Sequence, residues 1–295
     1  MYKSLEEIAQ VSKQKNIPFW QVILEDDCKE RMVSPEQSKK ELMAMYQAMK
    51  EADAAYDAKQ KSRSGMVGGN GQLFHDAVVS GKTICGPVIA SAIEKALKMG
   101  ESNACMKRIV AAPTAGACGV VPAVYLTLQE QRQIDDERML EAMYIASGVG
   151  GVIANRAFLA GAAGGCQAEI GSASSMAAAG AVYLAGGDTE AIIHAAAMAM
   201  KNLLGLACDP VAGLVEIPCI KRNAGGVTNA FCAAELALSG IESAIPLDEV
   251  ILAMKNVGDL MSQSLKETAE AGLASTKTAK ALYKKVFETI NKSLE

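Results

Sequence analysis

The stretch "SSMAAAGAVYLAGGDTEAIIHAAAMAMKNLLGLA", residues 174–207, decides the fold class. It reads as two helices, the first ended by Gly186-Gly187 and the second capped by Asp188 and stopped by Asp209-Pro210. Alanine-rich helices of this kind pack closely, whereas β-sheets are enriched in β-branched and aromatic residues. We therefore predict an all-α, mainly helical fold with a core rich in alanine and glycine and with glycine-rich functional loops.

The composition supports a helical protein with no nucleic-acid or membrane partner. Half of the 295 residues are hydrophobic, only 4% are aromatic, and the net charge of −4 leaves no basic footprint for nucleic acid or an acidic membrane. Residues 109–129 and 170–187 carry no charge, but proline interrupts the first, and serine and glycine are frequent in the second. Neither is the run of about 20 strongly apolar residues that a spanning helix needs.

The cysteine usage fits a reducing compartment. The start "MYKSLEEIAQVSKQKN" lacks the apolar region of a signal peptide, so we expect a cytoplasmic protein. Disulfides are rare in that compartment, and the eight cysteines are therefore expected to be free thiols or metal ligands.

A glycine-rich loop divides the sequence into two parts. Residues 1–63 are charged and helix-patterned, and Ser34-Pro35 predicts a helix that begins there and runs to about Lys59. The loop "SRSGMVGGNGQ", 62–72, then predicts the boundary between an N-terminal helical arm, 1–63, and a helical catalytic domain, 64–295.

Further helices follow the same rules of capping and termination. A helix from Pro87 is expected to end at Gly100, and one from Asp136 to continue at least to Ser147. Others are expected after the capping box "SLEE" at 4–7, over 246–261, and over 276–293 with a solvated basic face.

The chemistry of this sequence centres on cysteines in loops. "CDPVAGLVEIPC" places Cys208 and Cys219 beside prolines, and Cys166 follows Gly164-Gly165, where glycine lets the backbone approach a ligand. Cys219 lies near an expected helix start, where the helix dipole favours a thiolate. Three converging thiolates fit a [4Fe–4S] cluster with one open iron, or a zinc ion with an open position. The spacing alone does not separate these from buried core thiols.

Three long motifs carry a resemblance to a known family: "APTAGACGVVPAV" (112–124), "GCQAEIGSASSMAAAG" (165–180) and "LGLACDPVAGLVEIPCIKRNA" (204–224). Together with "SGMVGGNG" and "SGKTICGP", they resemble the alpha chain of the iron–sulfur-dependent L-serine dehydratases nearly end to end. The resemblance implies that Cys166, Cys208 and Cys219 hold a catalytic [4Fe–4S] cluster. It leaves five cysteines as small buried hydrophobes: Cys28, Cys85, Cys105, Cys118 and Cys232.

The resemblance also implies a second polypeptide. Single-chain members of the family fuse a domain with an "SSSHT" motif to the alpha-type region, and no such segment occurs in this sequence. Some relatives carry a further cysteine where this chain has Ser174, and some single-chain members carry one near a C-terminus that here reads "NKSLE". We expect a separate beta chain as partner, L-serine as substrate, and an oligomer.

The implied reaction is β-elimination of water from L-serine, which gives pyruvate and ammonia after tautomerisation and hydrolysis. The open iron would act as a Lewis acid on the substrate hydroxyl. The catalytic base is not identified. His75 follows the glycine-rich loop, His194 is expected to be a satisfied residue inside an apolar helix, and the partner chain is a further source.

Hydroxyl and basic side chains near the cysteine motifs are candidate site residues. Thr114 and Ser172 are candidate catalytic hydroxyls, and Ser174, Arg222 and Asn223 are candidate substrate-binding groups. For each hydroxyl the alternative is a helix cap, which is the commoner role of a serine beside a helix.

Other functions stay open at this level. An L-cysteine desulfidase would use the same scaffold, and a non-catalytic helical membrane or interaction module would contain ordinary core cysteines. A pyridoxal-phosphate lyase would need a Schiff-base lysine, and we find no persuasive pairing of a lysine with a glycine loop. The "GMVGGNG" loop lacks the Lys-Ser/Thr of a P-loop, so we interpret it as a mobile lid or substrate loop.

Overall fold

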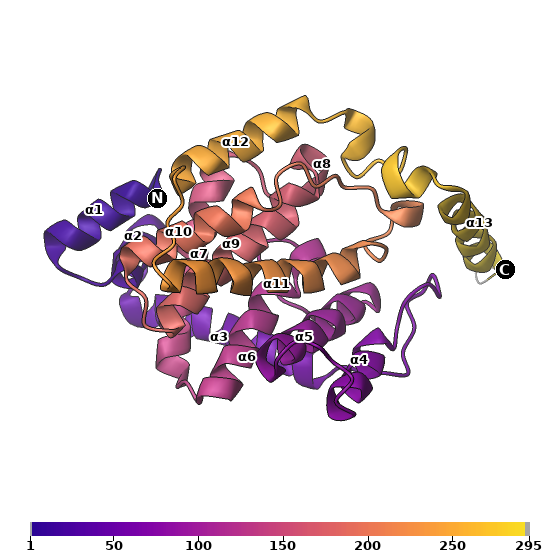
Figure 1. The fold of residues 1–295 in the computed structure, drawn as a ribbon, viewed down its shortest axis with the longest axis horizontal. Helices are drawn as coiled ribbons and strands as arrows, with labels where there is room; N and C mark the ends of the chain where they lie inside the picture. The colour runs from indigo at the N-terminus through magenta and orange to yellow at the C-terminus, as the bar shows by residue number, and fades with distance from the viewer. Residues whose placement is uncertain (1, 293–295) are drawn as a thin grey trace.

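The computed structural model describes residues 2–292, with side chains described for residues 2–287. The described chain contains thirteen α-helices, joined by loops and short helical turns (Figure 1). No strand lies among those residues, which confirms the all-α prediction. The helices are α1 (Leu5–Lys15), α2 (Phe19–Arg31), α3 (Pro35–Ala54), α4 (Asn70–Val79), α5 (Pro87–Ala104), α6 (Val120–Arg132), α7 (Asp136–Arg156), α8 (Gly161–Gly164), α9 (Ser172–Leu184), α10 (Thr189–Lys201), α11 (Cys219–Leu238), α12 (Leu247–Leu260) and α13 (Lys277–Lys292).

Helix α9 forms the centre of the bundle. All of its residues except Tyr183 are buried, and α6, α7, α10 and α11 pack around it. The approach of α6 is close enough that a side chain at Gly180 would overlap the Tyr125 ring, whose hydroxyl donates to the Met176 carbonyl at 3.2 Å. Small residues in this helix therefore set the distances to its neighbours, as its composition predicts.

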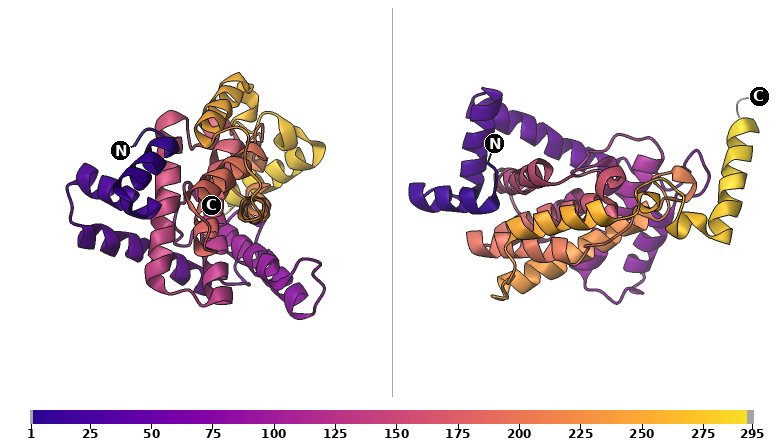
Figure 2. Two further views of the ribbon diagram at one scale, coloured as in Figure 1. Left: turned by 60° about the vertical axis from the view of Figure 1, so that its left-hand side comes forward. Right: turned by 90° about the horizontal axis from the view of Figure 1, so that it is seen from above.

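The N-terminal helices α1 to α3 pack on one side of this bundle, mainly against α7 (Figure 2). Their buried residues Leu5, Phe19 and Tyr46 belong to the same hydrophobic cluster as α9. The division into an arm, 1–63, and a catalytic domain, 64–295, stays a prediction.

Local capping signals in the sequence are confirmed. Ser4 accepts from the Glu7 amide at the start of α1, Ser34 from the Gln37 amide at the start of α3, and Asp188 from the Ala191 amide at the start of α10. Each cap satisfies an amide that has no partner inside its helix.

Several helix ends differ from the prediction. Helix α3 ends at Ala54 rather than near Lys59, and α10 ends at Lys201, before the Asp209-Pro210 stop. Helix α5 does not end at Gly100 but continues to Ala104, because Gly100 serves packing instead. A Cβ at Gly100 would lie 3.1 Å from the Ile220 side chain, so glycine lets α5 and α11 meet there.

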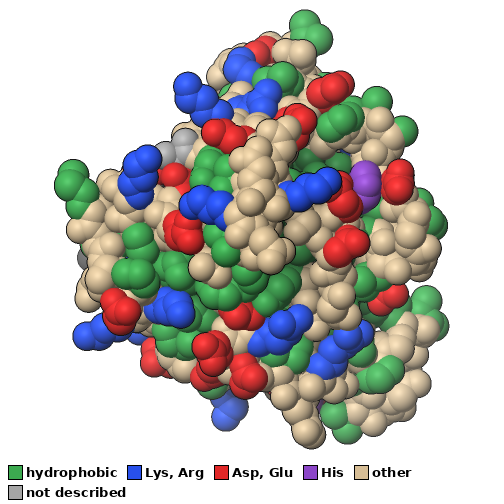
Figure 3. Space-filling model, turned by 90° about the vertical axis from the view of Figure 1, so that its left-hand side faces the viewer, with side chains coloured by type: hydrophobic (Ala, Val, Ile, Leu, Met, Phe, Trp, Pro, Cys, Tyr) green, Lys and Arg blue, Asp and Glu red, His purple; other side chains and the backbone are tan. Residues whose placement is uncertain are grey.

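The face on the α1 and α2 side carries Lys, Arg, Asp and Glu interspersed around apolar side chains (Figure 3). A cavity of about 350 Å³ opens there between α2, α3 and α7, with Ile23, Leu42 and Tyr144 in its lining. No described helix has the length and apolar character to cross a membrane.

Candidate functional site

Cys166 lies on a wide helical turn between α8 and α9. Gly165 before it has a φ of 77°, a left-handed conformation that glycine adopts without strain, and residues Gln167–Gly171 then form a π-helical turn. Gln167 fixes the loop that precedes Cys208, because its amide donates to the Leu206 carbonyl at 3.0 Å and its side chain accepts from the Gly205 amide at 2.9 Å. These bonds bring two distant cysteines together.

Cys208 is held by a segment that follows α12. Its amide donates to the Leu265 carbonyl at 2.8 Å, and its carbonyl accepts from the Glu267 amide at 2.7 Å. The adjacent Asp209 carboxylate accepts from the Leu273 amide and from the Arg222 guanidinium, each at 2.8 Å. We call residues 262–276 the C-terminal strap, because they fasten the Cys208 loop to the body of the protein.

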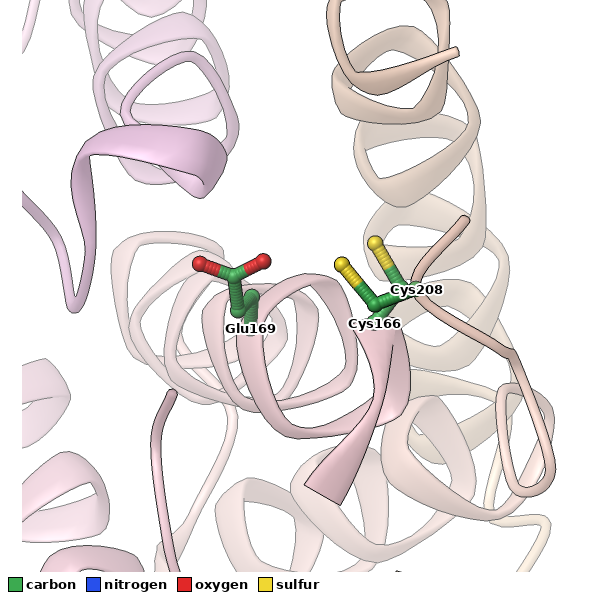
Figure 4. A group of neighbouring side chains, drawn as sticks. All are labelled: Cys166, Glu169 and Cys208. Atoms are coloured by element: carbon green, nitrogen blue, oxygen red, sulfur yellow. The ribbon is translucent and has the colours of Figure 1, made fainter. Parts of the chain in front are cut away.

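The sulfur atoms of Cys166 and Cys208 and a carboxylate oxygen of Glu169 all lie within 4.8 Å of one another (Figure 4). The three side chains point to the same side of the helical turn that carries Cys166 and Glu169. Cys219, the first residue of α11, does not join this set at that distance, although it is buried and feels the charge of Cys166.

The surroundings favour a thiolate at Cys166. A hydrogen bond from the Cys208 thiol, together with the nearby Arg222 guanidinium, lowers the pKa of Cys166. The same hydrogen bond raises the pKa of Cys208, and burial raises the pKa of Cys219 to about 12. The expected help of the α11 dipole at Cys219 is thus outweighed by burial.

Glu169 is the site residue that the sequence interpretation missed. Its carboxylate accepts from the Thr114 hydroxyl at 2.7 Å, and burial raises its pKa. The signal was the three-residue interval from Cys166, since positions i and i+3 lie on one face of a helical turn. Thr114, a candidate catalytic hydroxyl, thus reaches the cysteines through Glu169.

Of the other candidate residues, Arg222 and Asn223 contact the predicted cysteine ligands, whereas no such contact is seen for Ser172 and Ser174. Arg222 lies against Cys166, and its guanidinium also donates to the Ala207 carbonyl at 2.7 Å. Asn223 is buried and hydrogen-bonded to Gly116, Gly119 and Cys219, so it ties the Thr114 loop to α11.

Ser174 faces α11 rather than the cysteines: it donates to the Gly226 carbonyl at 2.9 Å and accepts from the Asn229 amide at 2.7 Å. The Ser172 hydroxyl is fully buried and has no hydrogen-bond partner. The catalytic and substrate-binding roles given to these residues stay predictions.

Two buried carboxylates hold the glycine-rich loop. Glu216, in the segment between Cys208 and Cys219, accepts from the Ser62 and Ser64 hydroxyls at 3.0 and 2.6 Å. Glu101 accepts from the amides of Asn70 and Gly71 at the other end of the loop, at 2.8 and 3.1 Å. The loop is therefore fastened to the cysteine-bearing segment at one end and to α5 at the other.

The remaining cysteines and histidines lie elsewhere. All eight cysteines are free thiols, but only Cys118 of the five outside the predicted ligand positions is buried, and the expectation of burial is wrong for the exposed Cys85 and Cys232. His194 accepts from the Ser243 amide at 3.2 Å, and His75 lies 3.1 Å from Glu94.

The donor set of this site fits an iron–sulfur cluster. Three buried free thiols come from three separate segments, and a guanidinium beside one of them favours the ionised form that a metal requires. Different irons of one cluster would take different thiolates, so the three cysteines need not converge on one point as the ligands of a single ion do.

Comparison with known proteins gives a consistent result over almost the whole chain. A family model described as "Serine dehydratase alpha chain" matches residues 14–274. A probable L-serine dehydratase alpha chain of Bacillus subtilis (strain 168) is 43% identical over 97% of this chain and 96% of its own length. The L-serine dehydratase alpha chain of Peptoniphilus asaccharolyticus is 41% identical over 96% and 97%.

A longer relative matches only in part. The L-serine dehydratase TdcG of Escherichia coli (strain K12) is 44% identical over 61% of this chain, and the match covers 40% of its own length. The similarity to the two alpha chains, in contrast, extends nearly from end to end. On this evidence, the chain belongs to the serine dehydratase alpha chain family.

Proposed function

We propose that this protein is the alpha chain of an iron–sulfur L-serine dehydratase, which eliminates water from L-serine to give pyruvate and ammonia. The observation that carries the proposal is the near end-to-end similarity to proteins named L-serine dehydratase alpha chain. The buried thiols described above support it. We further propose that a separate beta chain completes the enzyme, that the complex oligomerises, and that it works in the cytoplasm.

In this proposal Cys166, Cys208 and Cys219 hold a [4Fe–4S] cluster. When bound, the cluster supplies a Lewis acid that makes the substrate hydroxyl a better leaving group. The chain's own residues prepare the site: Arg222 provides positive charge beside Cys166, and the strap and Gln167 hold the Cys208 loop in place. Loss of the α-proton and of the β-hydroxyl gives the enamine of pyruvate, which tautomerises to an imine and is hydrolysed to pyruvate and ammonia.

The proposal is tested on protein isolated without oxygen, with and without the beta chain. Iron, sulfide and pyruvate formation are measured with L-serine and, as a comparison, with L-cysteine. Cys166→Ala, Cys208→Ala and Cys219→Ala are each expected to lose cluster iron and at least about a hundredfold in activity. Cys118→Ala is the matched control, because Cys118 is equally buried but bonds only to the Met99 carbonyl. Full iron content in all three ligand variants would show that the assigned site is wrong.

A further inference from the structure

We propose that the Glu169 carboxylate binds the α-ammonium group of the substrate and so makes the site specific for an α-amino acid over the corresponding α-hydroxy acid. The inference rests on the proposed function and deepens it. It concerns a residue that lies beside Cys166 and Cys208 but contributes no thiolate.

The first observation is that Glu169 has unused acceptor capacity. One carboxylate oxygen accepts from the Thr114 hydroxyl at 2.7 Å, and no described residue donates a hydrogen bond to the other oxygen. A carboxylate offers about four lone-pair sites, and a carboxylate shielded from water is costly unless those sites find donors. An ammonium group, with three N–H donors, supplies the hydrogen-bond donors that the protein does not provide to this oxygen.

The second observation is that glycine backbones border the carboxylate. A Cβ at Gly161 would lie 2.9 Å from both Glu169 Oε2 and Cys208 Sγ, and a Cβ at Gly116 would lie 3.0 Å from Oε1. Neither neighbour covers the carboxylate with a side chain, and Glu169 stays partly exposed. Because Glu169 stays partly exposed, a small ligand can reach its carboxylate.

The third observation is the distribution of charge around the cysteine pair. The cation on this side is Arg222, but its guanidinium bonds to Ala207 and Asp209 and lies against Cys166 rather than Glu169. The other carboxylate whose charge reaches Glu169 is Glu267, which adds repulsion. Arg222 and Glu169 thus place opposite charges near Cys166, as a zwitterionic amino acid requires.

The test uses two analogues that have no β-hydroxyl to lose, L-alanine and L-lactate, which differ in carrying an ammonium or a hydroxyl group. Their affinities for the cluster-containing complex are measured by anaerobic calorimetry. Wild-type protein is expected to bind L-alanine at least about tenfold more tightly than L-lactate, because a charge-assisted hydrogen bond is involved. Glu169→Gln, which keeps the shape, should lose that preference by weakening L-alanine alone.

Glu267→Gln is the matched control, because it removes a negative charge from the same neighbourhood at an exposed residue. It should leave the ratio of the two affinities unchanged. The proposal is overturned if wild-type protein does not distinguish the analogues, if Glu169→Gln keeps the preference, or if Glu169→Gln loses iron, which would place the carboxylate on the cofactor. Absence of pyruvate from L-serine with wild-type complex would instead refute the proposed function.

Discussion

Glu101 is a buried carboxylate and Glu169 a partly exposed one, and the two differ in the number of hydrogen-bond donors around them. Glu101 is 1% exposed and accepts from three groups: the amides of Asn70 and Gly71 and the Tyr56 hydroxyl at 2.7 Å. Glu169 accepts from the Thr114 hydroxyl alone and lies beside two thiols. The protein itself supplies three donors to Glu101, whereas Glu169 can accept further hydrogen bonds from a ligand.

This difference separates a structural role from a binding role. A buried carboxylate with three donors caps α4 and holds the glycine-rich loop, and its removal strands those donors. A carboxylate with a single donor stabilises the fold less and remains available to a ligand. The contrast makes opposite predictions for the two residues in stability and in activity.

The largest difference is expected in stability. Glu101→Gln places an amide against N–H and O–H donors and should lower the free energy of unfolding by about 2–3 kcal/mol, whereas Glu169→Gln should change it by less than about 1 kcal/mol. Urea unfolding of the metal-free proteins measures both, through a shift of midpoint at constant slope. Equal losses of unfolding free energy in the two variants would show that the number of donors does not distinguish the two carboxylates.

A tenfold or larger loss of activity is expected from Gly161→Ala. Its Cβ would press on both Glu169 Oε2 and Cys208 Sγ, so the two groups have to move apart. Gly225→Ala on the exposed side of α11 is the control, because nothing lies within 4 Å of its Cβ. That change should preserve kcat/KM and stabilise the helix by up to about 1 kcal/mol. Comparable activity in both variants would mean that the space around Glu169 tolerates a methyl group.

Asp209 is a third carboxylate, with two donors: it accepts from Arg222 and from the Leu273 amide, and so joins Arg222 to the C-terminal strap. Gly272 has a φ of 60°, and a Cβ there would also lie 2.5 Å from the Asp209 carboxylate. Gly240, with a φ of 82°, has no neighbour within 4 Å. Gly272→Ala should therefore cost about 1 kcal/mol more than Gly240→Ala and speed tryptic cleavage near Lys266. Equal cleavage rates would show that the strap does not depend on this contact.

The smallest effect is expected in alkaline solution. Burial and the hydrogen bond to Glu101 raise the pKa of Tyr56, so the folded state holds the phenolic proton to higher pH than the unfolded chain. This contribution to stability is present below the unfolded pKa of about 10 and is lost as pH rises through the folded pKa. Between pH 9.5 and 11, wild-type protein should lose up to about 1 kcal/mol more than Tyr56→Phe, since the partly exposed ring limits the effect. Parallel pH curves would argue against this coupling.

Local features of this fold were predictable, and features that depend on distant partners were not. Ser4, Ser34 and Asp188 cap helices through residues three positions away, so each signal is complete in a short window. The continuation of α5 through Gly100 depends on Ile220, 120 residues later, and no local pattern shows that contact.

The site follows the same rule. The motifs predict Cys166, Cys208 and Cys219 as ligands, and the structure places Cys166 and Cys208 side by side. Glu169 was overlooked because a glutamate in a helical pattern usually faces solvent, and its neighbour Thr114 is 55 residues away. The exposure of Cys232 likewise depends on which face of α11 is covered, and Cys85 lies in the exposed loop between α4 and α5.

The C-terminal strap has a consequence for biosynthesis. Both main-chain hydrogen bonds of Cys208 go to residues that are translated after it, Leu265 and Glu267. A nascent chain that has not yet exposed residue 267 lacks these partners, even when α5 to α11 are free to pack. The Cys208 loop therefore gains these two hydrogen bonds late in synthesis, and in a chain stalled before the strap Cys208 would be held only through the bonds of Gln167 and Arg222 to the residues that precede it.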